Sequence, residues 1–131
     1  MNVKTYLKAA LALTLVACGQ PKQPAVEEVA LSGNPVFEGW YADPEGIIYD
    51  DTYWIYPTWS DVYEKQTHFD CFSSKDLVTW TKHANIIDTT EVKWAKRAMW
   101  APAVIRKEGK YYLFFGANDV HEGEIGGIGV A

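Results

Sequence analysis

The chain has 131 residues, which is enough for about one domain of ordinary size. Its 17 acidic residues outnumber its 12 basic ones, giving a formal net charge of −5, so a phosphate backbone would be repelled and no nucleic-acid partner is expected. The aromatic residues, 15% of the chain, gather in short runs that are typical of strands rather than of helices.

Residues 1–17 have the features of a secretory signal peptide. Lys4 and Lys8 give it a basic start, and Tyr6–Ala17 is nearly all apolar but too short to span a membrane as a helix. Removal of this segment takes two of the 12 basic residues, which leaves 10 against 17 acidic ones and a formal charge of −7.

The segment "LVAC", which ends at Cys18, resembles the lipobox of bacterial lipoproteins, in which the cysteine is acylated and becomes the first residue. We therefore expect Cys18 to carry lipid and to be the only link to the membrane, at the bacterial cell envelope, either periplasmic or on the outer-membrane surface. The polar, proline-containing remainder of residues 18–32 is expected to be a flexible tether. An ordinary signal peptide with a chance cysteine is the alternative.

The remaining residues, 33–131, are predicted to form an all-β domain. Their apolar residues lie in short runs rich in Tyr, Trp, Ile, Val and Phe, separated by Gly, Asp, Asn or Lys-Glu pairs. Asp50-Asp51 and Glu108-Gly109 have the length of two-residue hairpin turns. Strands are expected over Gly46–Tyr49, Thr52–Pro57, His68–Ser73, Ala103–Lys107, Lys110–Gly116 and Gly126–Ala131.

The two predicted hairpins are copies of each other. A shift of 58 positions gives six like-for-like matches in thirteen positions, among them Pro44 with Pro102, Ile47 with Ile105, Tyr53 with Tyr111 and Tyr56 with Phe114. A repeat built of hairpins indicates the blades of a β-propeller. Because a propeller closes only with at least four blades, and the chain supplies fewer than two, we expect an incomplete propeller truncated at its C-terminus.

Asp43 is the residue that the repeat singles out. The second copy has Ala101 at the matching position, so the hairpin itself does not require an acid there. A carboxylate before the innermost strand of a blade would reach the axial pocket of a propeller, where it could act in catalysis. The alternative is an Asx-turn ahead of Pro44, and the local sequence leaves both interpretations open.

Five segments resemble, in order, the opening of glycoside hydrolase family 43: "NPVFEGWYADP", "YWIYPTW", "FDCFSSKDLVTW", "MWAPAVIRKEGKYYLFFGAND" and "GGIGVA". The resemblance implies a five-bladed β-propeller, of which about the first two blades are present. It also implies a glycosidase that cleaves arabinose- or xylose-containing plant cell-wall polysaccharides or oligosaccharides with inversion, and it places Asp43 at the general base.

Two further acids are needed and are not found. The family's general acid is a Glu, and a second Asp tunes its pKa; the resemblance places both in later blades, beyond Ala131. Glu122 and Glu124 lie in the loop of the second blade and match neither. We therefore expect the chain as written to be inactive and the full-length protein to be a glycosidase.

The resemblance also implies substrate contacts. Trp100 of the "WAP" motif and Trp59 would form walls around the sugar, since a flat indole face suits the apolar face of a pentose; packing roles are the alternative. Asn118 and Asp119, at the end of the second hairpin, are further candidates. No cofactor or metal-ligand set is evident, and a structural calcium ion in the full-length protein stays open.

Two other functions compete with this one. A retaining hydrolase of the fructan- and sucrose-cleaving type would carry its Asp in an "NDP" setting, and Ala42 in place of that Asn argues against it. A sugar-binding surface lipoprotein without catalysis is weakened by Asp43 but is excluded only by the later blades. The exact sugar, exo or endo action and the oligomeric state are not indicated.

Other conspicuous residues are expected to be structural. Cys71 falls in a predicted strand and is interpreted as a buried apolar filler. The segment "SKDLVTW" predicts a turn at Lys75-Asp76 with Leu77 and Trp80 turned inward. The three histidines lack the spacing of a metal site, and Lys93–Arg97 is expected to be a solvated loop.

Overall fold

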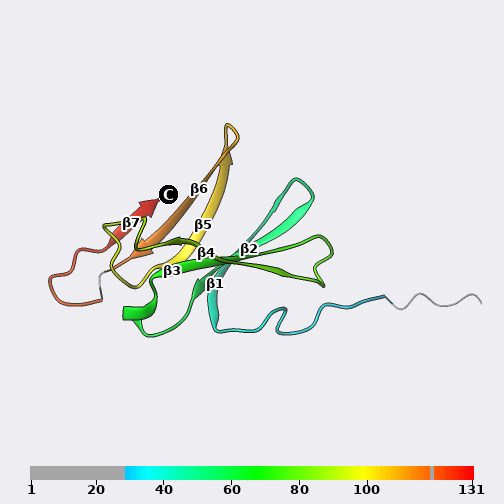
Figure 1. Ribbon diagram of the computed structural model, residues 1–131, viewed down its shortest axis with the longest axis horizontal. Coiled ribbons are helices and arrows are strands. Elements are labelled where there is room, and N and C mark those ends of the chain that lie inside the picture. Colours follow the sequence, from blue (N-terminus) through cyan, green and yellow to red (C-terminus); the bar gives the residue numbers. More distant parts are fainter. Residues whose placement is uncertain (1–28, 119) are drawn as a thin grey trace, which may run out of the picture.

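The computed structural model describes residues 29–118 and 120–131, which form two antiparallel sheets (Figure 1). The first sheet has the strand order β1-β2-β3-β4 and the second the order β5-β6-β7, so every strand pairs with its neighbour in sequence. The predicted all-β class is confirmed. The strands are β1 Tyr41–Tyr49, β2 Thr52–Trp59, β3 His68–Ser74, β4 Thr81–Asp88, β5 Trp100–Lys107, β6 Lys110–Ala117 and β7 Gly127–Val130, and a short 3₁₀ helix, η1, covers Tyr63–Lys65.

Each predicted strand is present, but the sequence analysis missed β4. This strand lies at the edge of the first sheet and pairs only with β3. Most of its side chains are exposed, so its sequence carries neither the alternation of a half-buried strand nor the apolar run of a buried one. Its place in the sheet depends on contacts that the local pattern does not contain.

Both predicted hairpin turns are confirmed. Tyr49 pairs with Thr52 across Asp50-Asp51, and the same register encloses Glu108-Gly109 in the second sheet. All four turn residues have positive φ: 47° and 59° in the first turn, 53° and 75° in the second. Positive φ at both central residues is the mark of a type I′ turn, whose twist matches that of the flanking strands.

The repeat seen in the sequence is also a repeat of backbone geometry. The β1–β2 register shifts between Ala42 and Glu45, and the β5–β6 register shifts between Trp100 and Ala103, 58 positions later. Inside these two bulges Asp43 has φ 46° and Ala101 has φ 47°. The bulge is therefore part of the blade architecture whichever side chain it carries.

The core lies between the two sheets. Phe69 of β3 and Phe115 of β6, both almost fully buried, meet edge to face with ring centroids 5.4 Å apart. Cys71 is 3% exposed, and burial raises the pKa of its thiol to about 12, so its predicted role as an apolar filler is confirmed. The other buried members of this cluster are Tyr56, Ala95, Met99, Val104, Leu113 and Ala117.

The turn after β3 forms as predicted, but Leu77 does not turn inward. Ser74 Oγ accepts the N–H groups of Asp76 and Leu77, and Asp76 Oδ1 accepts those of Val78 and Thr79. The last two bonds lower the pKa of Asp76 to about 2. Leu77, with φ 62°, takes a left-handed conformation in this turn and is 43% exposed.

Candidate active site

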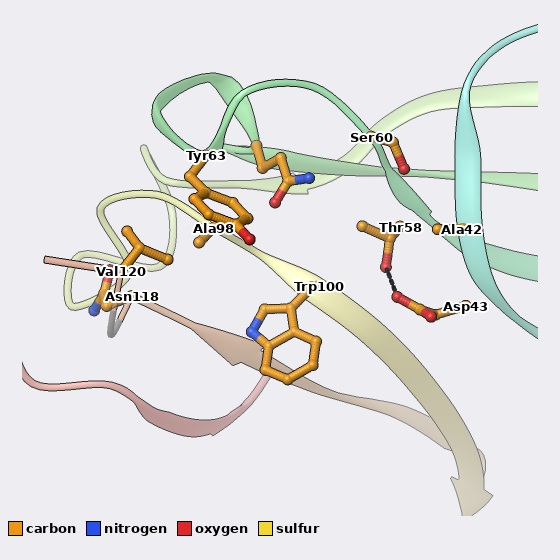
Figure 2. A pocket seen from close by; sticks show the side chains of 10 residues that line it. Ala42, Asp43, Thr58, Ser60, Tyr63, Ala98, Trp100, Asn118 and Val120 are labelled. Atoms are coloured by element: carbon orange, nitrogen blue, oxygen red, sulfur yellow. Dashed lines mark hydrogen bonds between the residues drawn. The ribbon is translucent and has the colours of Figure 1, made fainter.

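A pocket with a volume of about 390 Å³ opens at one end of the two sheets (Figure 2). In an antiparallel hairpin the start of the first strand lies beside the end of the second, so the starts of β1 and β5 share this end with the ends of β2 and β6. The pocket collects residues from β1, β2, β5 and η1 and from the loop that follows β6. They include Asp43, Thr58, Tyr63, Trp100, Asn118 and Val120.

Asp43 presents its carboxylate at this pocket. The residue is exposed and lies in the β1 bulge. Its Oδ2 accepts a hydrogen bond from the Thr58 hydroxyl at 3.4 Å. No hydrogen bond within the described ranges joins this carboxylate to a following backbone N–H, so the Asx-turn alternative is not observed.

Thr58 connects the Asp43 carboxylate to the second sheet. Its buried hydroxyl accepts the N–H of Ala101 at 2.7 Å, which directs its own proton to Asp43. Thr58 was not among the residues predicted from the sequence. Comparison of the two copies could have indicated it, because the position 58 residues later is Gly116. Both members of the Asp43–Thr58 pair are therefore absent from the second copy.

Trp100 lies in the same pocket, with half of its surface exposed. It pairs with Gly116 across the β5 bulge, and a Cβ atom at Gly116 would lie only 2.7 Å from the indole Nε1. The ring therefore rests directly over a position that has no side chain. An indole held at the surface of a pocket in this way offers its face to a ligand.

Trp59 does not line this pocket. Successive residues of a strand point to opposite faces, so Trp59 cannot share the orientation of Thr58. Its ring packs edge to face on Tyr41 at 5.4 Å, and the Lys82 ammonium lies 5.6 Å from the ring centre. The structure separates it from Asp43 and Trp100, and its predicted sugar contact stays a prediction.

Asn118 lines the pocket, but its amide is engaged with backbone groups on all sides. Oδ1 accepts the N–H groups of Lys96 and Arg97, and Nδ2 donates to the carbonyl oxygens of Trp94 and Ile125. The geometry shows Asn118 holding two loops together, and its contact with substrate stays a prediction. Asp119, Cys18, the signal peptide and the tether lie outside the described residues.

The histidines take part in separate hydrogen-bonded pairs and contacts. His83 Nε2 lies 2.8 Å from Ser73 Oγ, His121 Nε2 lies 3.0 Å from Glu64, and His68 Nε2 lies 3.8 Å from Asp70. Across residues 29–118 and 120–131 no three His, Cys, Asp or Glu side chains are grouped so as to hold a metal ion. The same ranges contain no helix long and apolar enough to cross a membrane.

The family follows from comparison with known proteins. Residues 32–131 match the family model described as glycosyl hydrolases family 43. Since this match covers most of the chain, the protein belongs to glycosyl hydrolase family 43, and the resemblance seen in the five sequence segments is confirmed.

Individual relatives agree. Over 110 residues the chain is 49% identical to the beta-D-galactofuranosidase xynD of Aspergillus niger, covering 76% of this chain and 31% of that protein. It is 30% identical over 102 residues to a xylosidase/arabinosidase of Bacteroides ovatus, covering 69% of this chain and 31% of that protein.

The solved structures define the architecture. A family 43 enzyme from Xanthomonas citri, complexed with xylotriose, is similar with a TM-score of 0.65 and 28% identity, covering 78% of this chain and 31% of that one. The two sheets are thus part of the five-bladed propeller of this family, as predicted. The chain spans 31% of the length of each of these relatives.

Proposed function

We propose that the full-length protein is a glycosidase that hydrolyses arabinose-, xylose- or galactofuranose-containing saccharides, such as those of plant cell walls, with inversion at the anomeric carbon. The relatives named as a galactofuranosidase and a xylosidase/arabinosidase support this range of sugars. The observation that carries the proposal is the exposed Asp43 carboxylate in a pocket beside Trp100, at a bulge that the second sheet builds with Ala101.

In this proposal Asp43 is the general base. The Thr58 hydroxyl occupies Oδ2, which leaves the other carboxylate oxygen to accept a proton from the attacking water. Thr58 can hold this orientation because the Ala101 N–H fixes its own oxygen. Removal of the proton makes the water a stronger nucleophile toward the anomeric carbon.

Trp100 would orient the sugar, its indole face lying against the apolar face of the ring, so that the anomeric carbon faces the activated water. The pocket volume of about 390 Å³ lies within the range of about 300–1,000 Å³ that is usual for small-ligand sites. The pocket therefore has the size of a small-ligand site.

Inversion also needs a general acid, about 6.5–9.5 Å from the base, so that a water fits between the base and the sugar. Asp43 is the only carboxylate among the described residues that line the pocket. In the proposed reaction the acid is supplied from elsewhere in the full-length protein.

The test is Asp43→Asn in the full-length protein, assayed on the 4-nitrophenyl glycosides of β-D-xylopyranose, α-L-arabinofuranose and β-D-galactofuranose. We expect kcat to fall about 10²- to 10⁴-fold, which is the usual contribution of a general base, with the melting temperature unchanged. Asp51→Asn is the matched control, since Asp51 is an exposed acid with φ 59° at the opposite end of the same hairpin. Unchanged turnover in Asp43→Asn would rule out the assignment.

Proton NMR of the first-formed anomer separates the proposal from its competitors. The inverted anomer supports it, whereas the retained anomer would indicate a retaining hydrolase of the fructan- and sucrose-cleaving type. Binding of xylotriose without turnover by the unmodified full-length protein would indicate a sugar-binding protein.

A further inference from the structure

Tyr63 is an aromatic side chain of the pocket to which the proposed reaction gives no role. It lies on η1, is 57% exposed and lines the pocket with Asp43 and Trp100. Figure 2 shows its ring turned into the pocket above Ala98, at the end away from Asp43, with Trp100 between the two. An exposed tyrosine facing a pocket offers both a flat apolar face and a hydroxyl to a ligand.

The backbone that carries Tyr63 is fixed to the segment that carries Trp100. The Tyr63 carbonyl accepts the N–H of Ala98 at 2.9 Å, and the Gln66 carbonyl accepts that of Met99 at 2.9 Å. Both donors directly precede Trp100. The backbones that carry the two rings are therefore held in a constant relation, which lowers the entropy that a ligand must overcome when it binds between them.

Polar contacts of Glu64 also join η1 to neighbouring segments. Glu64 Oε1 lies 3.0 Å from His121 Nε2 and 3.9 Å from Arg97 Nη1. Arg97 Nε in turn lies 3.2 Å from Glu124 Oε1, at an angle that makes an ion pair but no hydrogen bond. Each such contact contributes little alone, but together they join η1 to the β6–β7 loop.

We propose that Tyr63 is a specificity-determining residue that contacts the second sugar unit of the substrate, the unit adjoining the one at Asp43. This inference rests on the proposed function. The preferred ligand is then an oligosaccharide rather than a single glycosyl group, because the contact at Tyr63 lies at the far end of the pocket. The ring packs on the face of the second sugar, and the phenol hydroxyl exchanges a hydrogen bond with one of its hydroxyls.

The experiment compares Tyr63→Ala, Tyr63→Phe and the control Val62→Ala in the full-length protein. Val62 directly precedes Tyr63 and is equally exposed, at 57%, but does not line the pocket. Each variant is assayed on the glycosyl fluoride of the sugar that the unmodified protein hydrolyses best, which has no group to reach Tyr63, and on the trisaccharide of the same sugar.

We expect Tyr63→Ala to raise KM for the trisaccharide about tenfold with kcat nearly unchanged, the pattern of a lost binding contact. KM for the glycosyl fluoride should change less than about twofold, and Val62→Ala should match the unmodified protein on both substrates. Tyr63→Phe, which keeps the ring, should retain part of the preference for the trisaccharide.

Two results would overturn the assignment while leaving the proposed function intact: equal KM increases for both substrates, or a Tyr63→Ala variant that behaves like Val62→Ala. If the unmodified protein hydrolysed no glycoside of the panel and bound no trisaccharide, the proposed function would fail, and the assignment of Tyr63 with it.

Discussion

At the level of single residues, comparison of the two bulges shows that the fold requires the bulged backbone but not the carboxylate of Asp43. Ala101 has φ 47°, although the left-handed region costs a residue with a Cβ atom about 1–2 kcal/mol. The blade therefore imposes this backbone whichever side chain is present, and the carboxylate of Asp43 is an addition. The sequence repeat was sufficient to single out Asp43, whereas its partner Thr58 became evident only from the hydrogen bond to the second sheet.

Gly116 provides a test of the position of Trp100. In Gly116→Ala the new Cβ would lie 2.7 Å from Nε1 and 2.9 Å from Cε2 of the indole, so the ring must shift away from its place in the pocket. Because a misplacement of about 1 Å can cost as much as 10²-fold in catalysis, we expect kcat/KM of the full-length protein to fall at least tenfold. Steady-state kinetics and tryptophan fluorescence measure the effect.

The control is Gly46→Ala on β1, where an added Cβ meets nothing within 4 Å. It should leave both readouts unchanged. If Gly116→Ala had the kinetics of Gly46→Ala, then the placement of Trp100 would not matter for substrate.

At the level of elements, a buried carboxylate explains the strand that the sequence analysis missed. Asp70 of β3 is 1% exposed. It accepts hydrogen bonds from Tyr41 of β1 at 2.9 Å and from the Asn85 N–H of β4 at 2.9 Å, and it pairs with Lys82 of β4 at 2.8 Å. The edge strand is thus held by an ionic and hydrogen-bonded anchor, which an apolar pattern cannot indicate.

The pKa of Asp70 gives this anchor a pH dependence. Burial alone would raise the pKa, but the hydrogen bonds from Lys82, the Asn85 N–H and Tyr41 together outweigh burial and lower it below its ordinary value of 3.8. A carboxyl whose folded pKa is lowered stabilises the fold above its unfolded pKa. Its contribution is therefore complete at neutral pH and is lost as the pH falls below 3.8 through the folded pKa.

Asp70→Asn tests the anchor. We expect the variant of the full-length protein to lose about 2 kcal/mol at pH 7, since the charged acceptor of three buried or partly buried donors is removed. Urea unfolding at pH 7 and at pH 3 measures the difference, which should narrow at the lower pH. Asp51→Asn, an exposed change in a hairpin turn, should have nearly the same free energy of unfolding as the unmodified protein at either pH. If the stability lost in Asp70→Asn were the same at both pH values, the ionic role of Asp70 would be contradicted.

At the level of the whole molecule, the contact between the two sheets combines an apolar centre with polar links. Val104 of β5 donates its N–H to the Glu45 carboxylate, and its carbonyl oxygen accepts a hydrogen bond from the Tyr49 hydroxyl at 3.0 Å. At the exposed tip, Arg106 binds both carboxylate oxygens of Asp50 at 2.9 Å. Solvent screens this exposed pair, so it contributes little, and the apolar centre should dominate the stability of this interface.

Phe115→Ala tests this order of contributions. Phe115 is 1% exposed and packs against Phe69 and Trp94, so its truncation should cost about 3–5 kcal/mol. Arg106→Gln should cost much less, because solvent screens the exposed ion pair. Thermal unfolding of the full-length protein measures the stability of both variants. The stability of Phe115→Leu should lie between those of Phe115→Ala and Arg106→Gln. An Arg106→Gln variant less stable than Phe115→Ala would reverse the interpretation.

The sequence by itself determined the class, the two hairpins with their turns, the repeat and Asp43, because each depends on residues close together in the chain or on the comparison of two copies. The tertiary structure decided which residues meet. It brought Asp43, Thr58, Tyr63 and Trp100 to one pocket, turned Trp59 away from it and engaged the Asn118 amide with backbone groups. These outcomes depend on bulges, on the alternation of strand faces and on contacts between the two sheets, which pair residues distant in the chain and leave no local pattern.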